Sequence, residues 1–441
     1  MTSSNRVSRR MLWLAVVALF ALPTACDTLK SPLEVEPASR VPAGELEVSA
    51  NAQLLSVGAV GDFECAFNAY NLLSGSIGEE LIYAQQTASR SPYDRRNTHP
   101  SNDTDYATNA CNSGTGEVGV YTPLQIARQS NENLLALLKT WTDEEVAAGP
   151  GAPNRTNLIA IAAAYAGYSY VLLGEGFCTM AISSVNLDKT LTYGGEIQRD
   201  SVFRLAIARF SEAIAAATTA NNTQIRTMAY LGRARAKLNI ADYAGAKADA
   251  EQVPVGYVQN VSASATATNR INRVASQNGP TFTNFSIGEP YRSMDDARVP
   301  VEASDLPPSA TGVTHYYQTK YPTTATPIPL ATYEEAQLII AEADIRSGSL
   351  GTALAIINDS RDRGGQTAFV GLTQEDYLAE LIDQRRRELF LESHHLGDVI
   401  RYGIDLQPPA GSPYHFGGVY GTQICLPLPA AERLNNPLIG S

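Results

Sequence analysis

Apolar residues recur at intervals of three and four over much of the chain. The spacing is clearest at Ile161, Tyr165, Tyr168 and Leu172, where it predicts a helix over residues 159–173. Similar patterns predict helices over 124–139, 201–217, 224–239, 241–251, 333–348 and 350–363, and Leu378, Ile382 and Leu389 mark one more. We therefore expect a mainly α fold.

Two pairs of these helices resemble tetratricopeptide units. Residues 229–234 (AYLGRA) open one helix, and residues 242–246 (DYAGA) mark the turn and the start of its partner. The helices over 333–348 and 350–363 form the second pair. Small residues let paired helices approach closely, and each pair must stack on a neighbour to bury its apolar face. The expected scaffold is a stack of helix pairs.

A long segment without helical periodicity separates the two pairs. Residues 253–330 are rich in Pro, Ser, Thr, Asn and Tyr. Because a structureless loop of this length is unusual inside a compact domain, we expect a large irregular insertion with short strands and turns. Loops held on a rigid scaffold are where binding residues usually lie.

The N-terminus has the features of an export signal. Three arginines precede an apolar run over 11–22, which is too short to span a bilayer and has the length of a signal-peptide core. The run ends at residues 23–26 (PTAC), which resemble a lipobox in which Cys26 is lipidated. Ordinary cleavage near Ala25 is the alternative. Arg9-Arg10 also fits a twin-Arg signal, so the export route stays open.

These features divide the chain into three parts. We expect a signal peptide over 1–25, a lipid anchor and flexible spacer over 26–50, and a single domain over 51–441 that contains the insertion. The mature chain is expected to meet the membrane through the lipid anchor only.

Four cysteines remain once Cys26 is set aside: Cys65, Cys111, Cys178 and Cys425. An even number in an exported chain favours disulfides, with three possible connectivities. We favour Cys65–Cys111, which would staple a Gly- and Asn-rich loop. Cys178 would then pair with Cys425 and tie the end of a helix to the C-terminal tail.

The charge balance argues against some partners. Asp and Glu number 45 against 33 Lys and Arg, and removal of the signal leaves a net charge of −15. A body this acidic is not expected to bind nucleic acid or anionic lipid.

No catalytic, cofactor or metal motif stands out. Residues 114–119 match GxGxxG but lack the preceding strand and following helix that a dinucleotide site needs. Adjacent helical residues point about 100° apart, so His394 and His395 do not readily face one metal ion. We find no GxSxG nucleophile motif. The sequence therefore predicts a protein without a cofactor, a bound metal or an enzymatic activity.

Charged residues near the C-terminus predict a structural network. Arg385, Glu388 and Glu392 lie at spacings that place them on one helical face. We expect them to pair with Asp398 and Arg401 and so hold the last helix on the scaffold.

Several C-terminal motifs carry a family resemblance. Residues 333–343 (YEEAQLIIAEA), 384–398 (QRRRELFLESHHLGD) and 426–429 (LPLP), with Asp296-Ala297-Arg298, resemble the SusD/RagB family of nutrient-binding outer-membrane lipoproteins. The sequence departs from the family pattern at Gln384, Thr332 and His395.

The resemblance implies a tetratricopeptide-like scaffold that bears an irregular ligand-binding face. It also implies a TonB-dependent, SusC-like outer-membrane barrel as partner, over which the lipoprotein sits as a lid on the cell exterior. The ligand would be a glycan or a peptide, and the family catalyses nothing. A helical-repeat assembly lipoprotein of the cell envelope and an exported hydrolase are the alternatives.

In that family the N-terminal loops and the mid-chain insertion meet on one face. Tyr residues cluster in both segments here, and such rings can stack on a sugar or pack a peptide side chain. We therefore expect ligand contacts from six residues: Tyr83, Tyr93, Arg95, Tyr291, Tyr316 and Tyr317.

Overall fold

The computed structural model describes residues 43–85, 91–99, 106–107 and 119–440, so Cys26 lies outside the described residues. The chain divides into two units, Met1–Glu47 and Val48–Ser441. The described part of the first unit contains one short helix, α2 (Ala43–Leu46). Everything below concerns the second unit.

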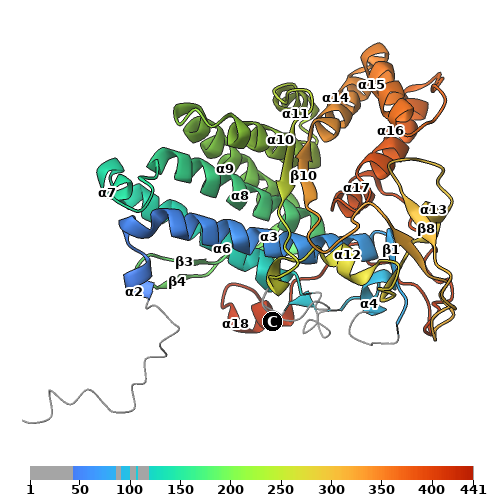
Figure 1. The fold of residues 1–441 in the computed structure, drawn as a ribbon, viewed down its shortest axis with the longest axis horizontal. Helices are drawn as coiled ribbons and strands as arrows, with labels where there is room; N and C mark the ends of the chain where they lie inside the picture. Colours follow the sequence, from blue (N-terminus) through green and yellow to red (C-terminus); the bar gives the residue numbers. More distant parts are fainter. Residues whose placement is uncertain (1–42, 86–90, 100–105, 108–118, 441) are drawn as a thin grey trace, which may run out of the picture. The chain divides into compact units, whose positions relative to one another are not determined.

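The longer helices form a scaffold in which sequence neighbours pack together (Figure 1). The first group is α3 (Ala52–Ile77), α6 (Tyr121–Thr140), α8 (Arg155–Gly176), α9 (Arg199–Thr219), α10 (Thr223–Asn239) and α11 (Tyr243–Ala250). The second group is α14 (Tyr333–Ser347), α15 (Leu350–Arg363), α16 (Gln374–Glu388) and α17 (His395–Tyr402). Contacts between α11 and α14 join the two groups. The mainly α, tetratricopeptide-like fold is confirmed.

Helix α8 forms the centre of the first group. Its N-terminus is capped by Asn154, whose side chain accepts a hydrogen bond from the Asn157 amide. Phe210 of α9 fits closely against it, since a Cβ added to Gly167 would lie 2.6 Å from the Phe210 ring. By length and composition alone, α8 could cross a membrane. However, 83% of its most apolar window is buried inside the protein, as expected for a core helix.

The second group has a small core of its own. Leu338, Ile345, Ile357 and Leu381 are fully buried between α14, α15 and α16. Thr332 caps α14 by accepting from the Glu335 amide, and Thr373 forms a capping box at the start of α16. Local sequence signals and packing therefore agree in this region.

The strands of the described residues are short and pair as antiparallel hairpins or ribbons. The pairs are β1 (Leu81–Tyr83) with β7 (Phe285–Ile287), β2 (Thr179–Ala181) with β5 (Glu196–Gln198), β3 (Ser184–Val185) with β4 (Leu191–Thr192), β6 (Val258–Val261) with β10 (Ile328–Thr332), and β8 (Val301–Ala303) with β9 (Tyr316–Gln318). Short helices complete the unit: η1 (Ser49–Asn51), α4 (Ser91–Asp94), α7 (Asp143–Ala147), η3 (Thr268–Arg270), α12 (Arg273–Gln277), α13 (Glu289–Arg292) and α18 (Ala430–Asn435). The predicted insertion thus contains short strands, as expected, and three short helices that were not expected, η3, α12 and α13.

A disulfide fixes the C-terminal tail to the end of α8. Cys178 and Cys425 are bonded, which confirms that prediction. The same junction is held by backbone hydrogen bonds, 2.9 Å from the Cys178 amide to the Leu426 carbonyl and 2.8 Å from the Leu426 amide to the Gly176 carbonyl. Cys65 is also disulfide-bonded. Its predicted partner, Cys111, lies outside the described residues.

The C-terminal charge network differs in part from the prediction. Asp398 accepts hydrogen bonds from Arg385 (2.8 and 3.0 Å) and from Arg401 (2.9 Å), as expected. These arginines hold the pKa of the Asp398 carboxyl well below its usual range, despite the opposing effect of burial. Arg401 also pairs with Glu342 of α14, at 2.5 Å, so the cluster does fasten α17 to the scaffold.

The two glutamates of the predicted network lie elsewhere. Glu388 pairs with Arg298 at 2.9 Å, and Glu392 pairs with Lys320 at 2.7 Å. Glu388 lies on α16 as Arg385 does, but it pairs with Arg298 and Arg363 instead. For Glu392 the prediction fails because α16 ends at Glu388. The following turn therefore breaks the helical spacing on which the shared face depended.

Candidate ligand-binding face

Three of the six predicted binding residues are core residues. Tyr83, Tyr93 and Tyr291 are 1%, 1% and 0% exposed. The Tyr83 ring lies 5.1 Å from that of Phe285, and the Tyr291 ring lies 5.0 Å from that of Phe390. Rings this deep cannot stack on a ligand unless the core opens. The prediction is wrong for these three residues, because burying their large apolar rings is the more favourable use of them.

The other three predicted residues are partly exposed. Tyr317 lies on the β8–β9 hairpin, where its hydroxyl donates a 2.6 Å hydrogen bond to Glu302. Arg95 follows α4, and Tyr316 begins β9. The structure therefore leaves Arg95, Tyr316 and Tyr317 as accessible candidates.

The β1–β7 pair brings the N-terminal segment against the insertion. Tyr83 of β1 is paired with Phe285 of β7. The Ser286 side chain then connects β7 to the next hairpin, because its hydroxyl accepts a 3.0 Å bond from the Tyr316 amide. Helix α13 follows β7 directly and carries Arg292. Residues far apart in sequence thus meet, as the family resemblance implied.

A third segment joins them, residues 408–424. The Gly421 amide donates to the Arg95 carbonyl at 2.7 Å, and the Gln423 amide donates to the Arg96 carbonyl at 3.2 Å. Asp94 is the side chain that joins the parts, since it accepts from the Tyr83 amide at 3.0 Å and from the Tyr414 hydroxyl at 2.8 Å.

The Asp94 carboxyl is a perturbed acid. Burial raises its pKa to about 7, although the hydrogen bonds from the Tyr414 hydroxyl and the Tyr83 amide oppose the shift. The carboxyl is therefore partly protonated near neutral pH. A group in this state beneath a candidate site makes the local structure sensitive to pH.

Three arginines stack on tyrosine rings where these segments meet. The guanidinium carbon lies 5.8 Å from the ring centre for Arg95 over Tyr414, 4.9 Å for Arg96 over Tyr420, and 4.8 Å for Arg292 over Tyr316. We call these six residues the arginine–tyrosine cluster.

The stacks form one group. The Tyr414 and Tyr420 rings meet edge to face at 5.1 Å. Burial raises the pKa of the Tyr420 hydroxyl, and the positive charges of Arg96 and Arg292 both oppose that rise. A cavity of about 600 Å³ borders Arg96 and is lined mainly by residues 403–410 and 421–424.

Four members of the cluster were missed from the sequence: Arg96, Arg292, Tyr414 and Tyr420. The available signal was the Gly- and Tyr-rich composition of residues 411–421, which lie between the last scaffold helix and the LPLP segment. Binding residues lie disproportionately on such loops.

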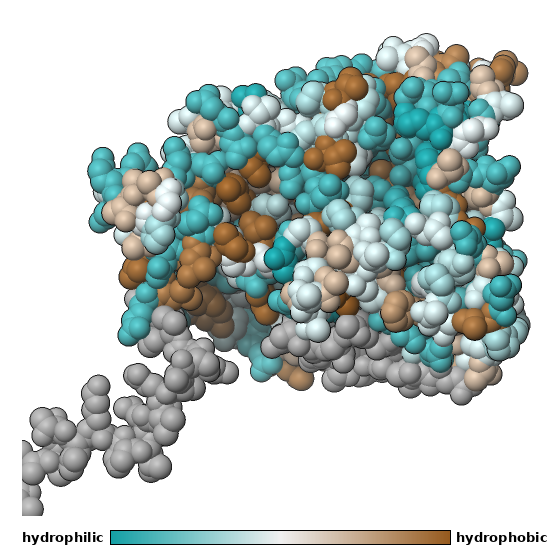
Figure 2. All heavy atoms as spheres, in the orientation of Figure 1, coloured by the Kyte–Doolittle hydropathy of each residue, from teal (hydrophilic) through white to brown (hydrophobic). Residues whose placement is uncertain are grey.

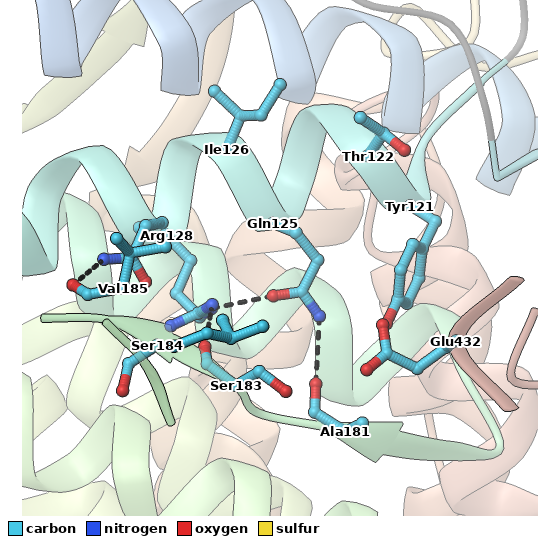
Figure 3. A pocket seen from close by; sticks show the side chains of 12 residues that line it. Tyr121, Thr122, Gln125, Ile126, Arg128, Ala181, Ser183, Ser184, Val185 and Glu432 are labelled. Carbon is cyan, nitrogen blue, oxygen red and sulfur yellow. Dashed lines mark hydrogen bonds between the residues drawn. The ribbon is translucent and has the colours of Figure 1, made fainter. Parts of the chain in front are cut away.

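A second hollow, of about 260 Å³, lies between α6 and the β2–β3 segment (Figure 3). Its polar side chains are used to fasten this segment to α6. Gln125 donates to the Ala181 carbonyl at 3.2 Å, and Arg128 donates to the Ser183 carbonyl at 2.6 Å. Tyr121 donates to Glu432 at 2.9 Å. What remains open in this hollow is mainly apolar, with Ile126 beside it.

No group of three or more His, Cys, Asp or Glu residues suited to a metal ion occurs among the described residues. The adjacent histidines instead take part in buried contacts. His394 lies 2.8 Å from Arg235 and 3.1 Å from Glu335. The His395 ring packs edge-on against Tyr291 at 6.0 Å.

Comparison with known proteins finds a likeness to the SusD family. The model of the SusD family matches residues 292–426. The starch-binding protein SusD of Bacteroides thetaiotaomicron is 34% identical over 116 residues, which are 25% of this chain and 20% of that protein. The matched segment is thus about a fifth of that relative's length.

Solved structures extend the likeness over most of the chain. A SusD superfamily protein and a SusD-like carbohydrate-binding protein, both from Bacteroides vulgatus, superpose with TM-scores of 0.65 and 0.66 at 14% and 13% identity. Each alignment covers 89% of this chain and 98% or 97% of the other. Surface glycan-binding protein A from Bacteroides uniformis gives a TM-score of 0.65 at 16% identity, covering 88% and 98% of the two chains. Together with the motifs, these findings support the resemblance of the chain to the SusD/RagB family.

Proposed function

We propose that this chain is a surface lipoprotein that captures a nutrient oligosaccharide or peptide and delivers it to a TonB-dependent outer-membrane transporter, without catalysis. The observation that carries the capture step is the meeting of three distant segments at the arginine–tyrosine cluster on a SusD-like scaffold. The names of similar proteins refer to starch, carbohydrate and glycan, so we favour an oligosaccharide.

The chemistry of the cluster suits reversible capture. The partly exposed Tyr316 ring offers a flat apolar face for a sugar ring, and guanidinium N–H groups can donate to hydroxyls. Ring stacking contributes about 0.5–1.5 kcal/mol beyond area burial, so a few such contacts hold a ligand without trapping it. Weak binding fits a protein that must pass its cargo on.

The capture step is tested with the mature protein on a glycan array and a peptide library, followed by calorimetry with the best binder. Tyr316→Ala should weaken binding about three- to tenfold. Tyr243→Ala is the matched control, because Arg346 stacks on that ring at 5.2 Å far along the scaffold. Equal affinities for the two variants would place the site elsewhere. Failure of every glycan and peptide to bind would remove the capture function itself.

Attachment to the outer membrane would come from lipid on Cys26, facing the cell exterior. Two or more acyl chains, at about 0.8 kcal/mol per buried CH₂, make such an anchor effectively permanent. The spacer between Cys26 and Val48 reaches roughly 75 Å when fully extended. The body therefore stays close to proteins of the same membrane.

An apolar surface near the start of the body supports a partner at that membrane. Leu54 and Val57 on α3 are 60% and 59% exposed, unusually high for large apolar side chains. Figure 2 shows hydrophobic surface in the region where α3, α6 and the β3–β4 hairpin lie in Figure 1. The exposed apolar residues there are Val48, Leu54, Val57, Ile126, Val185, Leu187 and Leu191. We name this group the apolar patch.

We propose that the apolar patch docks on the TonB-dependent barrel. Contiguous exposed apolar surface marks protein or membrane contacts, and the body begins at this patch, close in sequence to the anchor. Leu54→Asp combined with Val57→Asp should abolish co-purification of the barrel from outer membranes while thermal stability is kept. Leu372→Asp, at an 88% exposed position, is the control. Retained co-purification of the barrel by the double variant would refute this docking site. The docking site would also be refuted if the double variant kept its binding to the barrel but lost binding to pure lipid vesicles.

A further inference from the structure

The arginines of the arginine–tyrosine cluster differ from most other arginines in the described part of the protein in that they are not ion-paired with a carboxylate there. Elsewhere arginines commonly pair with carboxylates, as Arg235 does with Glu175 at 2.6 Å and Arg385 with Asp398 at 2.8 Å. Arg95, Arg96 and Arg292 form no ion pair with a carboxylate among the described residues. Three cations that form no such ion pair lie together in a mature chain whose net charge is −15.

Each of these guanidinium groups uses only part of its hydrogen-bonding capacity. Arg95 donates through Nε to the Val419 carbonyl at 2.9 Å, and Arg292 through Nε to the Ile287 carbonyl at 2.7 Å. A guanidinium carries five N–H donors. The two terminal nitrogens of Arg95 and of Arg292 are therefore left without a partner among the described residues. These terminal nitrogens form the fork that binds a carboxylate through two parallel hydrogen bonds.

The third arginine is held more deeply. Arg96 is 5% exposed, and it donates through a terminal nitrogen to the Pro408 carbonyl. Its buried Nε has no hydrogen-bond partner among the described residues. Burial lowers the pKa of Arg96 and of Arg292, which is the sign of cations that have lost water without gaining an equal anionic contact. An arriving anion would restore that interaction.

The nearby acidic side chains do not supply an anionic contact to these arginines. Glu289 lies in the same short helix as Arg292 but makes no ion pair with it within 4.0 Å. Asp94 is buried and bonded to the Tyr83 amide and the Tyr414 hydroxyl. Glu79, which interacts with Arg96 over a longer range, is also buried. The tyrosine rings meanwhile fix the planes of the guanidinium groups, so little side-chain entropy is lost on binding.

We infer that the ligand of this face carries carboxylates, as a uronic-acid oligosaccharide does, with Arg95 and Arg292 as the residues that select it. The inference rests on the proposed capture of a glycan. A neutral sugar could also accept hydrogen bonds from these groups, but it would leave the positive charges unbalanced. The acidic body repels anions at long range, so attraction has to come from this cluster.

The test is calorimetric titration of the mature protein with a panel of uronic-acid oligosaccharides, the same oligosaccharides as neutral methyl esters, and a glutamate-rich peptide. The acidic sugars should bind at least about tenfold tighter than their esters, and the advantage should shrink at high salt. Arg95→Gln and Arg292→Gln should each weaken binding of the acidic sugar about tenfold and weaken binding of the ester much less. Arg346→Gln, which removes the stack on Tyr243, should change neither.

Two results would overturn the inference that the ligand is an acidic sugar without removing the capture function. Equal affinity for acid and ester would show that the charges do not select the ligand. Preference for the glutamate peptide would show that the carboxylates are not those of a sugar. If no glycan or peptide binds, the capture function fails as well, so the two failures are distinguishable.

Discussion

The buried Asp94 carboxyl makes the stability of the protein depend on pH in an unusual direction. It is 5% exposed, and burial raises its pKa to about 7. In the unfolded chain an aspartate titrates near about 3.9. Between these values the folded protein keeps a proton that the unfolded chain has released. The folded state therefore loses stability from this group as pH rises through 7.

The size of the effect follows from the shift. Each pKa unit corresponds to about 1.4 kcal/mol. The unfolded and folded pKa values of Asp94 bound the pH range over which stability is lost, and roughly two units of that range lie above pH 5. Ionisation of Asp94 should thus cost about 3 kcal/mol over that range. Asp94→Asn removes the titration. It also loses an accepted hydrogen bond, but that cost of about 1–3 kcal/mol is the same at both pH values.

The assay is urea denaturation of wild type and Asp94→Asn at pH 5 and pH 8. The difference in unfolding free energy between the two proteins should shift by about 3 kcal/mol in favour of the variant at pH 8. Asp405→Asn, at an exposed neighbouring position, should follow the wild type at both pH values. A difference for Asp94→Asn that stays constant within about 1 kcal/mol would refute the reasoning.

Further predictions concern the anchors of the fold and of the membrane. Asp398→Asn should lower the unfolding free energy by about 3–5 kcal/mol because it leaves the buried Arg385 unpaired, whereas Glu196→Gln, in an exposed pair, should cost less than about 1 kcal/mol; similar urea midpoints would contradict this. Replacing Cys178 and Cys425 by Ser should cost about 4–5 kcal/mol, and a melting temperature equal to wild type would count against it. Cys26→Ser should move the protein from the membrane to the soluble fraction, and unchanged fractionation would rule out the lipid anchor.

The helices could be predicted because their signals are local. The spacing of Ile161, Tyr165, Tyr168 and Leu172 describes one face of a helix whatever surrounds it, and α8 is found there. The capping residue Thr373 acts in the same way at α16. The charge network failed where it depended on a helix end, since Glu392 lies in a turn beyond α16.

The binding face could be predicted only in part, because it depends on tertiary contacts. A tyrosine in a polar segment has the same sequence pattern whether it points inward, as Tyr291 does, or remains partly exposed, as Tyr316 does. The stacking of Arg96 on Tyr420 joins residues more than 300 positions apart. Such a pair is set by the β1–β7 ribbon and the C-terminal segment, which no local pattern reveals.

Hydrogen exchange with and without a bound oligosaccharide tests the central claim most directly. Amides in residues 93–99, 289–292, 316–318 and 411–424 should gain protection when the ligand binds, because the three segments meet at the arginine–tyrosine cluster. Amides at the α11–α14 junction should not change. Protection confined to α6 and the β3–β4 hairpin, with none in the cluster, would contradict the account.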